Sequence, residues 1–232
     1  MPRAPPALRA LRRPTPRGMD SAQGARLDFP AMSSPEKSSP LVSFREMQYG
    51  TREDYLLLDE SERQYARGLA DRVLEQLGKL DHSLKGYPVS RLQHSLQTAT
   101  RALRDGADEE MIVAALLHDI GDELAPYNHA EMAAAILRPY VRPEVTWIVA
   151  QHGLFQNYYY VHHSGGDRHA RERWRDHPWY AACVHFCAAW DQCSFDPDYP
   201  AEPLATFEPM VRRIFSRTPH DPRYLADAPV LT

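Results

Sequence analysis

The stretch that decides the fold is Met111-Ile112-Val113-Ala114-Ala115-Leu116-Leu117-His118-Asp119-Ile120-Gly121. Its first seven residues are all apolar and leave no polar face, which is typical of a helix that is buried on every side. Acidic residues occupy positions 108 to 110, where the N-terminus of a helix prefers negative charge. The sequence therefore predicts a central, buried helix that ends in a histidine and an aspartate.

Helical periodicity continues on both sides of this segment. From about Ser61 onward, apolar residues recur every four positions up to Leu77, and a second helix is expected from Ser90, as its cap, to about Arg104. Because no segment has the alternating pattern of a strand, we predict an all-α fold, a single helical bundle. Further helices are expected at about residues 129–137, 144–151, 178–190 and 203–215, with prolines near their edges.

Residues 1–42 differ from the rest of the chain in composition. They are rich in Pro, Arg, Ser and Ala and carry no periodic apolar pattern, so we predict a disordered extension followed by a bundle over residues 43–232, with its core at about 61–216. The early arginines are similar to an organellar transit peptide, but the prolines argue against an amphipathic helix. We therefore interpret residues 1–31 as an unstructured extension or as the product of an upstream start codon, with Met32 or Met47 as the functional start.

Composition limits the class of protein. With 232 residues, 43% hydrophobic and 25% charged, the chain can form one domain with a substantial core. Its net charge of −4 provides no basic field for nucleic acid or an anionic membrane, and no apolar run approaches the roughly 20 residues of a membrane span. The three cysteines are odd in number and close together, which does not suggest the disulfide framework of a secreted protein. We therefore expect a soluble protein in a reducing compartment, the cytoplasm. Cys183 and Cys187 are interpreted as small buried residues and not as ligands.

The pair His118-Asp119 is the strongest functional signal. Two polar side chains at the end of an apolar helix are costly to bury unless they are satisfied, and coordination of a metal ion would satisfy both. Imidazole nitrogen and carboxylate oxygen suit Zn, Fe, Mn or similar ions, and a carboxylate can bridge two ions. Gly121 would permit close backbone approach or a left-handed cap.

Four further residues are expected near the pair. A hairpin of two antiparallel helices would bring His94 beside His118, and His129 and His152 lie at helix ends that face the same end of the bundle. Asp191 ends an apolar segment in the same way. Because a lone histidine is more often an ordinary surface or core residue, no metal site is assigned to the others, which are His82, His162, His163, His169, His177, His185 and His220.

This order of residues, a His, then His-Asp, then His, His and Asp, resembles the HD-domain superfamily of metal-dependent enzymes over roughly residues 87–196. The resemblance implies two divalent metal ions and a role for each of the six residues. Asp119 would bridge both ions and is the expected catalytic residue. By the same resemblance the first ion is held by His94, His118, Asp119 and Asp191, and the second by Asp119, His129 and His152.

Two branches of the superfamily use similar ligands. Phosphohydrolases use paired Mn, Co or Mg ions to activate water at phosphorus, whereas mixed-valent di-iron oxygenases use dioxygen to cleave C–C or C–P bonds. The residues around His94, from Leu92 to Ala99, are similar to the oxygenase branch, as is Trp190-Asp191. We therefore favour an oxygenase that contains two iron ions. Its expected substrate is a small polar metabolite, either neutral or anionic. A phosphohydrolase acting on a nucleotide or phosphate ester, and a non-catalytic binding module, stay as alternatives.

Three residues are candidates for substrate contact. Tyr87 is the one group that is comparable to the tyrosine and glutamate lid that the phosphonate-degrading oxygenases carry before the first histidine. The lysine that those enzymes carry after the fourth histidine has no counterpart here. The segment Tyr158 to His169 could close over the metals as a lid, with His163 or Arg168 holding an anionic group. The alternative is an exposed charged segment whose tyrosines pack on the core. Asp122 and Glu123 are interpreted as acids of an exposed loop, with acceptance of a hydrogen bond from a ligand imidazole as the alternative.

Overall fold

The structure is a computed structural model that describes residues 40–225, so residues 1–39 and 226–232 lie outside the described part. The predicted disordered extension and the alternative start at Met32 fall almost wholly outside it. The chain divides into two units, residues 1–41 and 42–232. All of the described helices lie in the second unit.

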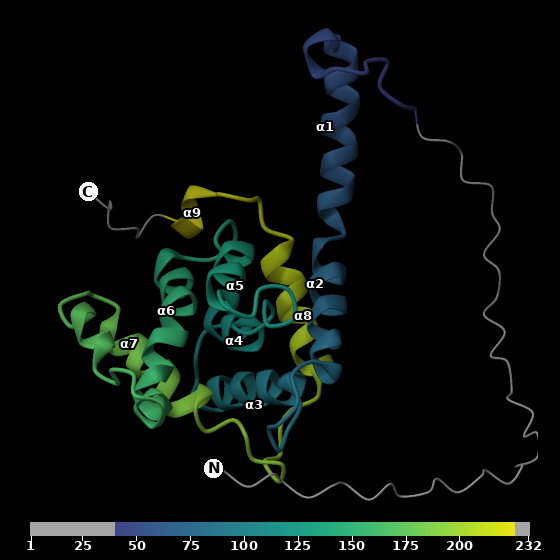
Figure 1. The fold of residues 1–232 in the computed structure, drawn as a ribbon. Coiled ribbons are helices and arrows are strands. Elements are labelled where there is room, and N and C mark those ends of the chain that lie inside the picture. The colour runs from purple at the N-terminus through teal and green to yellow at the C-terminus, as the bar shows by residue number, and fades with distance from the viewer. Residues whose placement is uncertain (1–39, 226–232) are drawn as a thin grey trace, which may run out of the picture. The chain divides into compact units, whose positions relative to one another are not determined.

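The described residues form helices and no strand, which confirms the predicted all-α fold (Figure 1). Short 3-10 turns η1 (Met47–Tyr49), η2 (Leu80–His82), η3 (Val161–Ser164) and η4 (Ala170–Trp174) and one π-helical turn, η5 (Phe186–Asp191), connect or extend the α-helices. The α-helices are α1 (Arg52–Arg67), α2 (Leu69–Lys79), α3 (Arg91–Arg104), α4 (Glu109–Leu117), α5 (His129–Leu137), α6 (Pro143–Tyr160), α7 (Tyr180–His185), α8 (Leu204–Phe215) and α9 (Pro222–Leu225).

Helix α4 is the centre of the bundle, as its apolar sequence predicts. The side chains of residues 111–117 are all buried, and α4 packs against α3, α6 and α8. Asp108 caps the helix by accepting a hydrogen bond from the backbone N–H of Met111 at 3.0 Å. With no polar face to leave in water, this helix can lie only in the middle of the molecule, which places its C-terminal His118 and Asp119 inside the protein.

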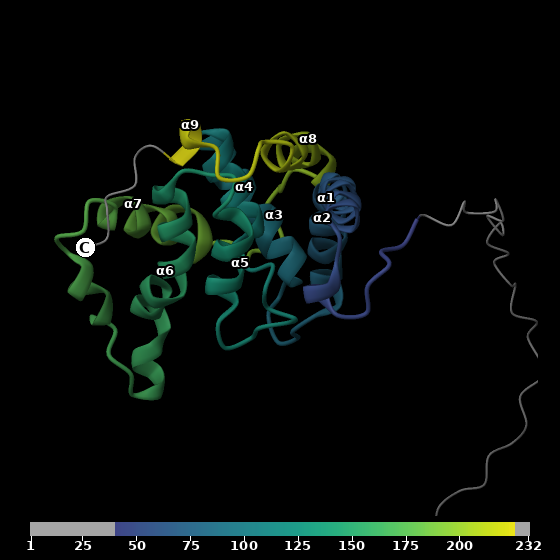
Figure 2. The ribbon, with the colours of Figure 1, turned by 90° about the horizontal axis from the view of Figure 1, so that it is seen from above.

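The N-terminal helices begin earlier than expected. The periodicity indicated one helix from about Ser61, but α1 starts at Arg52 and the chain breaks at Gly68 before α2. Figures 1 and 2 show α1 continuing the direction of α2. Tyr65 is 68% exposed, whereas Val73 and Leu77 on α2 are buried, so the apolar pattern contributes to the core only after Gly68.

Helix α6 is longer than the expected segment of about residues 144–151. It starts at Pro143 and continues without interruption to Tyr160, so the tyrosine-rich stretch belongs to a helix that also carries His152. Cys183 and Cys187 are buried against this helix, with Sγ atoms 3.8 and 3.6 Å from the carbonyl oxygens of Ile148 and His152. Their interpretation as small core residues fits this placement. Within residues 40–225, no helix combines the length and apolarity that a membrane span requires.

Candidate metal centre

Six polar side chains converge at one end of α4. His94 comes from the first turn of α3, His118 and Asp119 directly follow α4, and His129 is the first residue of α5. His152 lies in the middle of α6, and Asp191 ends η5. The structure thus brings together all six residues that the sequence singled out as metal ligands.

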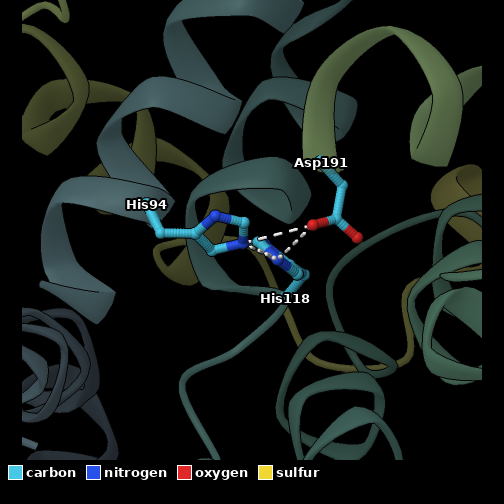
Figure 3. A group of neighbouring side chains, drawn as sticks. All are labelled: His94, His118 and Asp191. Atoms are coloured by element: carbon cyan, nitrogen blue, oxygen red, sulfur yellow. Dashed lines mark hydrogen bonds and ion pairs between the residues drawn. The ribbon is translucent and has the colours of Figure 1, made fainter. Parts of the chain in front are cut away.

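The first group consists of His94, His118 and Asp191 (Figure 3). The Nε2 atoms of the two histidines are 3.1 Å apart, and they lie 3.2 and 3.6 Å from Oδ1 of Asp191. All three side chains are buried, with at most 2% of their surface exposed. Oδ2 of Asp191 is buried and has no hydrogen-bond partner among the described residues. A buried carboxylate oxygen without a partner is costly, which favours a ligand at this position.

Backbone carbonyls fix the orientation of both histidines in this group. Nδ1 of His94 lies 2.9 Å from the carbonyl oxygen of Ser194, and Nδ1 of His118 lies 2.8 Å from that of Ala115. Each Nδ1 can therefore donate its proton to a carbonyl, which leaves Nε2 as an unprotonated lone pair directed into the group. This is the tautomer that a metal ion requires.

The second group lies on the other side of Asp119. Nε2 of His129 and Nε2 of His152 are 3.3 and 3.4 Å from Oδ1 of Asp119. Nδ1 of His152 is fixed by the carbonyl oxygen of Val149 at 2.7 Å. Nδ1 of His129 faces a side chain instead, Oδ1 of Asp122 at 3.3 Å.

The two carboxylate oxygens of Asp119 face different histidines. Oδ2 lies 3.4 Å from Nε2 of His94 and 3.2 Å from Nε2 of His118, whereas Oδ1 faces the second group. Ligand atoms about 2.1 Å from one ion are about 3.0–3.4 Å from one another in octahedral or tetrahedral geometry. The donor pairs here are 3.1–3.6 Å apart, so the arrangement fits two ions bridged by Asp119.

The histidines and carboxylates of the cluster shift one another's pKa values. Burial opposes charge on His118 and His94, but the hydrogen bonds and charges of Asp119 and Asp191 outweigh it and raise the pKa of both histidines. Burial likewise works against the two carboxylates, yet their histidine neighbours hold the pKa of Asp119 and of Asp191 below the usual range. For His129, burial dominates and lowers the pKa. Metal-free protein therefore keeps protons on the first group that a cation would displace.

Gly121 allows α5 to approach the His-Asp pair. A Cβ atom at this position would lie 2.8 Å from the carbonyl oxygen and 2.9 Å from the Cα of His129. Its φ is not among the positive values, so close approach and not a left-handed cap explains the glycine. Any larger residue would push His129 away from Asp119.

The π-helical turn η5 places Asp191. The turn Phe186–Asp191 follows α7 directly, and a π-helical turn changes the direction in which the residues after it point. Nε1 of Trp190 donates to Oδ2 of Asp105 at 3.0 Å, which holds the end of the turn against the C-terminus of α3. Asp191 can then face His94 and His118.

Sequence reasoning missed one residue of the centre and underestimated another. Arg91, the first residue of α3, is buried and donates hydrogen bonds to Asp119 and Asp122. The favoured interpretation of Asp122 as an exposed loop acid is wrong, because its side chain is only 10% exposed and contacts both Arg91 and His129. The spacing of Arg91, three residues before His94 on the same helix, is the signal that could have revealed it.

A cavity of about 610 Å³ opens onto the cluster, within the size range of small-molecule sites. Tyr87, the predicted substrate contact in the loop before α3, lines it and is 50% exposed. The other lining residues come from the 84–91 segment, the 122–129 segment, α6 and the 191–195 segment, and include Asp122, Gln156, Tyr159, Tyr160, Gln192 and Phe195.

The structure places His163 and Arg168 away from this cavity. His163 lies in η3 and is exposed, with its ring 4.1 Å from that of His162, and neither it nor Arg168 is among the lining residues. The guanidinium of Arg168 lies 4.4 Å from the ring centroid of Tyr158. Contact of these two residues with substrate stays a prediction, and the described conformation resembles the alternative of a segment packed on the core.

Comparison with known proteins supports the resemblance to HD-domain proteins. Residues 91–187, from Arg91 to Cys187, match the HD domain family. The chain is also similar to the [1-hydroxy-2-(trimethylamino)ethyl]phosphonate dioxygenase (glycine-betaine-forming) of Leisingera caerulea, with 35% identity over 89 residues. This match covers 34% of the present chain and 45% of the relative, so the chain spans about half the length of the curated relative. The predicted resemblance to HD-domain proteins is thereby confirmed.

Proposed function

We propose that this protein is a binuclear metal-dependent HD-domain enzyme, and that it is an iron-dependent oxygenase that cleaves a C–C or C–P bond of a small polar metabolite, which can be anionic. The observation that carries the proposal is the division of Asp119, whose Oδ1 and Oδ2 face two separate sets of histidines. A carboxylate placed between two sets of imidazoles is able to bridge a pair of ions through its two oxygens.

The proposed ligands follow from the two groups. His94, His118 and Asp191, with Asp119, would hold one ion, and His129, His152 and Asp119 would hold the other. A pair of iron ions in two oxidation states would supply the redox chemistry that the use of dioxygen needs. Resemblance of the residues around His94 to the oxygenase branch, and similarity to a protein named as a dioxygenase, both favour iron.

The chain's own residues would prepare the reaction. The backbone carbonyls at Ala115, Val149 and Ser194 orient three of the imidazoles, and Arg91 holds Asp119 and Asp122 in place. Tyr87 stands at the cavity and would contact the substrate and limit access of water. These roles position donor atoms before substrate arrives, so little reorganisation is needed in the reaction.

The experiment begins with protein that is produced anaerobically with iron. We expect about two iron ions per chain and, after partial oxidation, a half-integer-spin electron paramagnetic resonance signal that an organic substrate perturbs. Less than one equivalent of any transition metal would overturn the enzyme proposal and leave the non-catalytic binding module as the explanation. The variant His118→Ala should lose both metal and activity, and activity without metal would show that the site is wrongly placed.

A phosphohydrolase is the second candidate. The floor of the cavity carries three carboxylates, Asp119, Asp122 and Asp191, and oxygen-rich sites suit Mg and Mn. Hydrolysis of a nucleotide or phosphate ester with Mn, Co or Mg, without consumption of oxygen, would support this candidate and overturn the oxygenase. Oxygen consumption that depends on substrate and iron would do the reverse.

A further inference from the structure

One face of α6 carries three residues that line the cavity. His152, Gln156 and Tyr160 are four residues apart, so they lie on the same side of the helix, one turn after another. The helix rises about 5.4 Å per turn, so Gln156 stands about one turn and Tyr160 about two turns from the ligand His152. This face therefore leads from the metal centre outward to the mouth of the cavity.

The side chain of Tyr160 faces the mouth. It is 57% exposed, and partial burial, together with the neighbouring phenol of Tyr87 and the carboxylates of Asp191 and Asp119, raises its pKa. With its pKa raised, the hydroxyl stays protonated and can act as a hydrogen-bond donor. Gln192, which also lines the cavity, is already engaged, because its amide donates to the carbonyl oxygen of Ala188 at 3.1 Å.

Two aromatic residues outside α6 also line the cavity. The ring of Tyr87 stacks on Phe195 with centroids 5.0 Å apart, and Phe195 stacks on His94 at 4.3 Å. Both Tyr87 and Phe195 line the cavity. A compound in the cavity would therefore meet hydrogen-bonding groups on α6 and the stacked rings of Tyr87 and Phe195 elsewhere on the wall.

The described lining offers no unpaired Arg or Lys to an anionic group. Among the lining residues within 40–225, Arg91 is the one Arg or Lys, and its guanidinium is held by the carboxylates of Asp119 and Asp122. An anionic group far from the metal ions would lie beside neutral amide and phenol groups, with Asp122 nearby. Such a group would lose hydration without gaining a cation.

We propose that Gln156 and Tyr160 bind the part of the substrate that extends away from the metal ions, and that this part is uncharged and bears hydroxyl groups. This inference rests on the proposed metal centre, which holds the other end of the substrate. The substrate class is then a polyhydroxylated compound with a metal-binding group at one end. The hydroxyl groups of such a compound would meet α6, and its C–H groups would meet the stacked rings of Tyr87 and Phe195.

A set of six-carbon acids tests the proposal, because they share a 2-hydroxycarboxylate end that can bind metal and differ at the far end. Gluconate ends in a hydroxyl group, glucarate in a carboxylate and 6-phosphogluconate in a phosphate, and 2-hydroxyhexanoate has no far hydroxyl groups. Binding is measured by the change in the visible absorption of protein loaded with Co(II), which needs no turnover. We expect gluconate to bind at least about tenfold more tightly than each of the other three acids.

Two variants locate the binding groups. Gln156→Leu and Tyr160→Phe should each weaken gluconate binding about five- to tenfold, the loss expected for one neutral hydrogen bond, and leave 2-hydroxyhexanoate unchanged. Tyr158→Phe is the matched control, because Tyr158 lies on the same helix, packs against Arg168 and Arg171, and is not a lining residue. It should bind both acids as the unaltered protein does.

The outcomes separate this inference from the proposed function. Protein that takes up less than one equivalent of Co(II) would overturn the metal centre itself. Protein that loads Co(II) but prefers glucarate or 6-phosphogluconate, or fails to bind gluconate, would overturn the inference alone. The same holds if Gln156→Leu and Tyr160→Phe weaken gluconate and 2-hydroxyhexanoate equally.

Discussion

The two halves of the candidate metal centre share Asp119 but differ in how the protein encloses them. In the first half, His94, His118 and Asp191 are at most 2% exposed. In the second half, the side chain of His129 is 25% exposed and lies at the cavity. One half is built into the core, and the other forms part of the surface that substrate would reach.

The halves also differ in what fixes their histidines. Backbone carbonyls of Ser194 and Ala115 hold both histidines of the first half, and both Ser194 and Ala115 are buried. His129 depends on the side chain of Asp122, which in turn is held by Arg91. We infer that the first half binds its ion tightly and exchanges it slowly, whereas occupancy of the second half depends on a chain of side chains.

The largest effect is expected for the residue that the halves share. Asp119→Asn replaces a carboxylate that faces both groups with an amide, so both ions should be lost, with a fall in affinity of more than about 100-fold. Metal content after dialysis, measured by mass spectrometry, checks this. Glu123→Gln is the matched control, because Glu123 is a nearby exposed acid whose contact is Gln76. Retention of either ion by Asp119→Asn would show that the carboxylate does not bridge.

Two variants compare the first half, which is buried, with the second half, which is open to the cavity. Asp191→Asn removes a ligand from the buried half and leaves His94 and His118 with Asp119 as their remaining carboxylate partner, so it should lower both the metal content and the melting temperature. His129→Ala removes a ligand from the open half, so it should lose about one ion per chain at a nearly unchanged melting temperature. Equal losses of stability in the two variants would contradict the comparison.

A smaller effect is expected at Asp122, which contacts the candidate ligand His129. Asp122→Asn weakens the partner of Nδ1 of His129, so the second ion should bind about 10- to 100-fold more weakly while the first is unchanged. Titration with Co(II) should show two equivalents, of which only the weaker one shifts. A shift of both equivalents by the same factor would show that Asp122 acts on the whole centre and not on its open half.

The mildest perturbation is pH. In metal-free protein the pKa of His94 and of His118 is raised, so their contribution to stability is complete below about pH 6.5, the unfolded value, and is lost as pH rises through the raised values. The lowered pKa of Asp119 and Asp191 adds stability above about pH 4, which is lost as pH falls through the lowered values. The stability that this cluster gives to metal-free protein should therefore decline from pH 6 to pH 9.

Metal should reverse this trend, because protons and metal ions compete for the same Nε2 atoms. The increase in melting temperature on adding Co(II) is expected to grow from pH 6 to pH 8, as followed by circular dichroism. His118→Gln, which removes one titrating group, should flatten the metal-free profile in the same range. A metal-dependent increase that shrinks as pH rises would contradict the proton assignments of the buried half.

Much of the fold could be predicted because it depends on local pattern. The apolar run from Met111 to Leu117 can avoid water on every side only as a buried helix. Ser90 and the prolines near helix edges mark boundaries that the structure shows within a few residues. The break at Gly68 and the extension of α6 to Tyr160 were not predicted. Both depend on which face of a helix finds partners, which periodicity alone does not reveal.

The six candidate ligands could also be selected from the sequence, because a polar pair after a buried helix has few satisfactory partners. By itself the sequence determined the all-α fold, the buried His118-Asp119 pair and the set of histidines and aspartates that accompany it. Only the tertiary structure decided that Oδ1 and Oδ2 of Asp119 face different histidines and that a π-helical turn directs Asp191 inward. It alone decided, too, that Asp122 supports His129 of the open half and that Arg91 binds both Asp122 and the shared Asp119. The physical reason is that helix boundaries follow from neighbours in the chain, whereas the direction of a side chain at a site follows from elements that are distant in sequence and packed together.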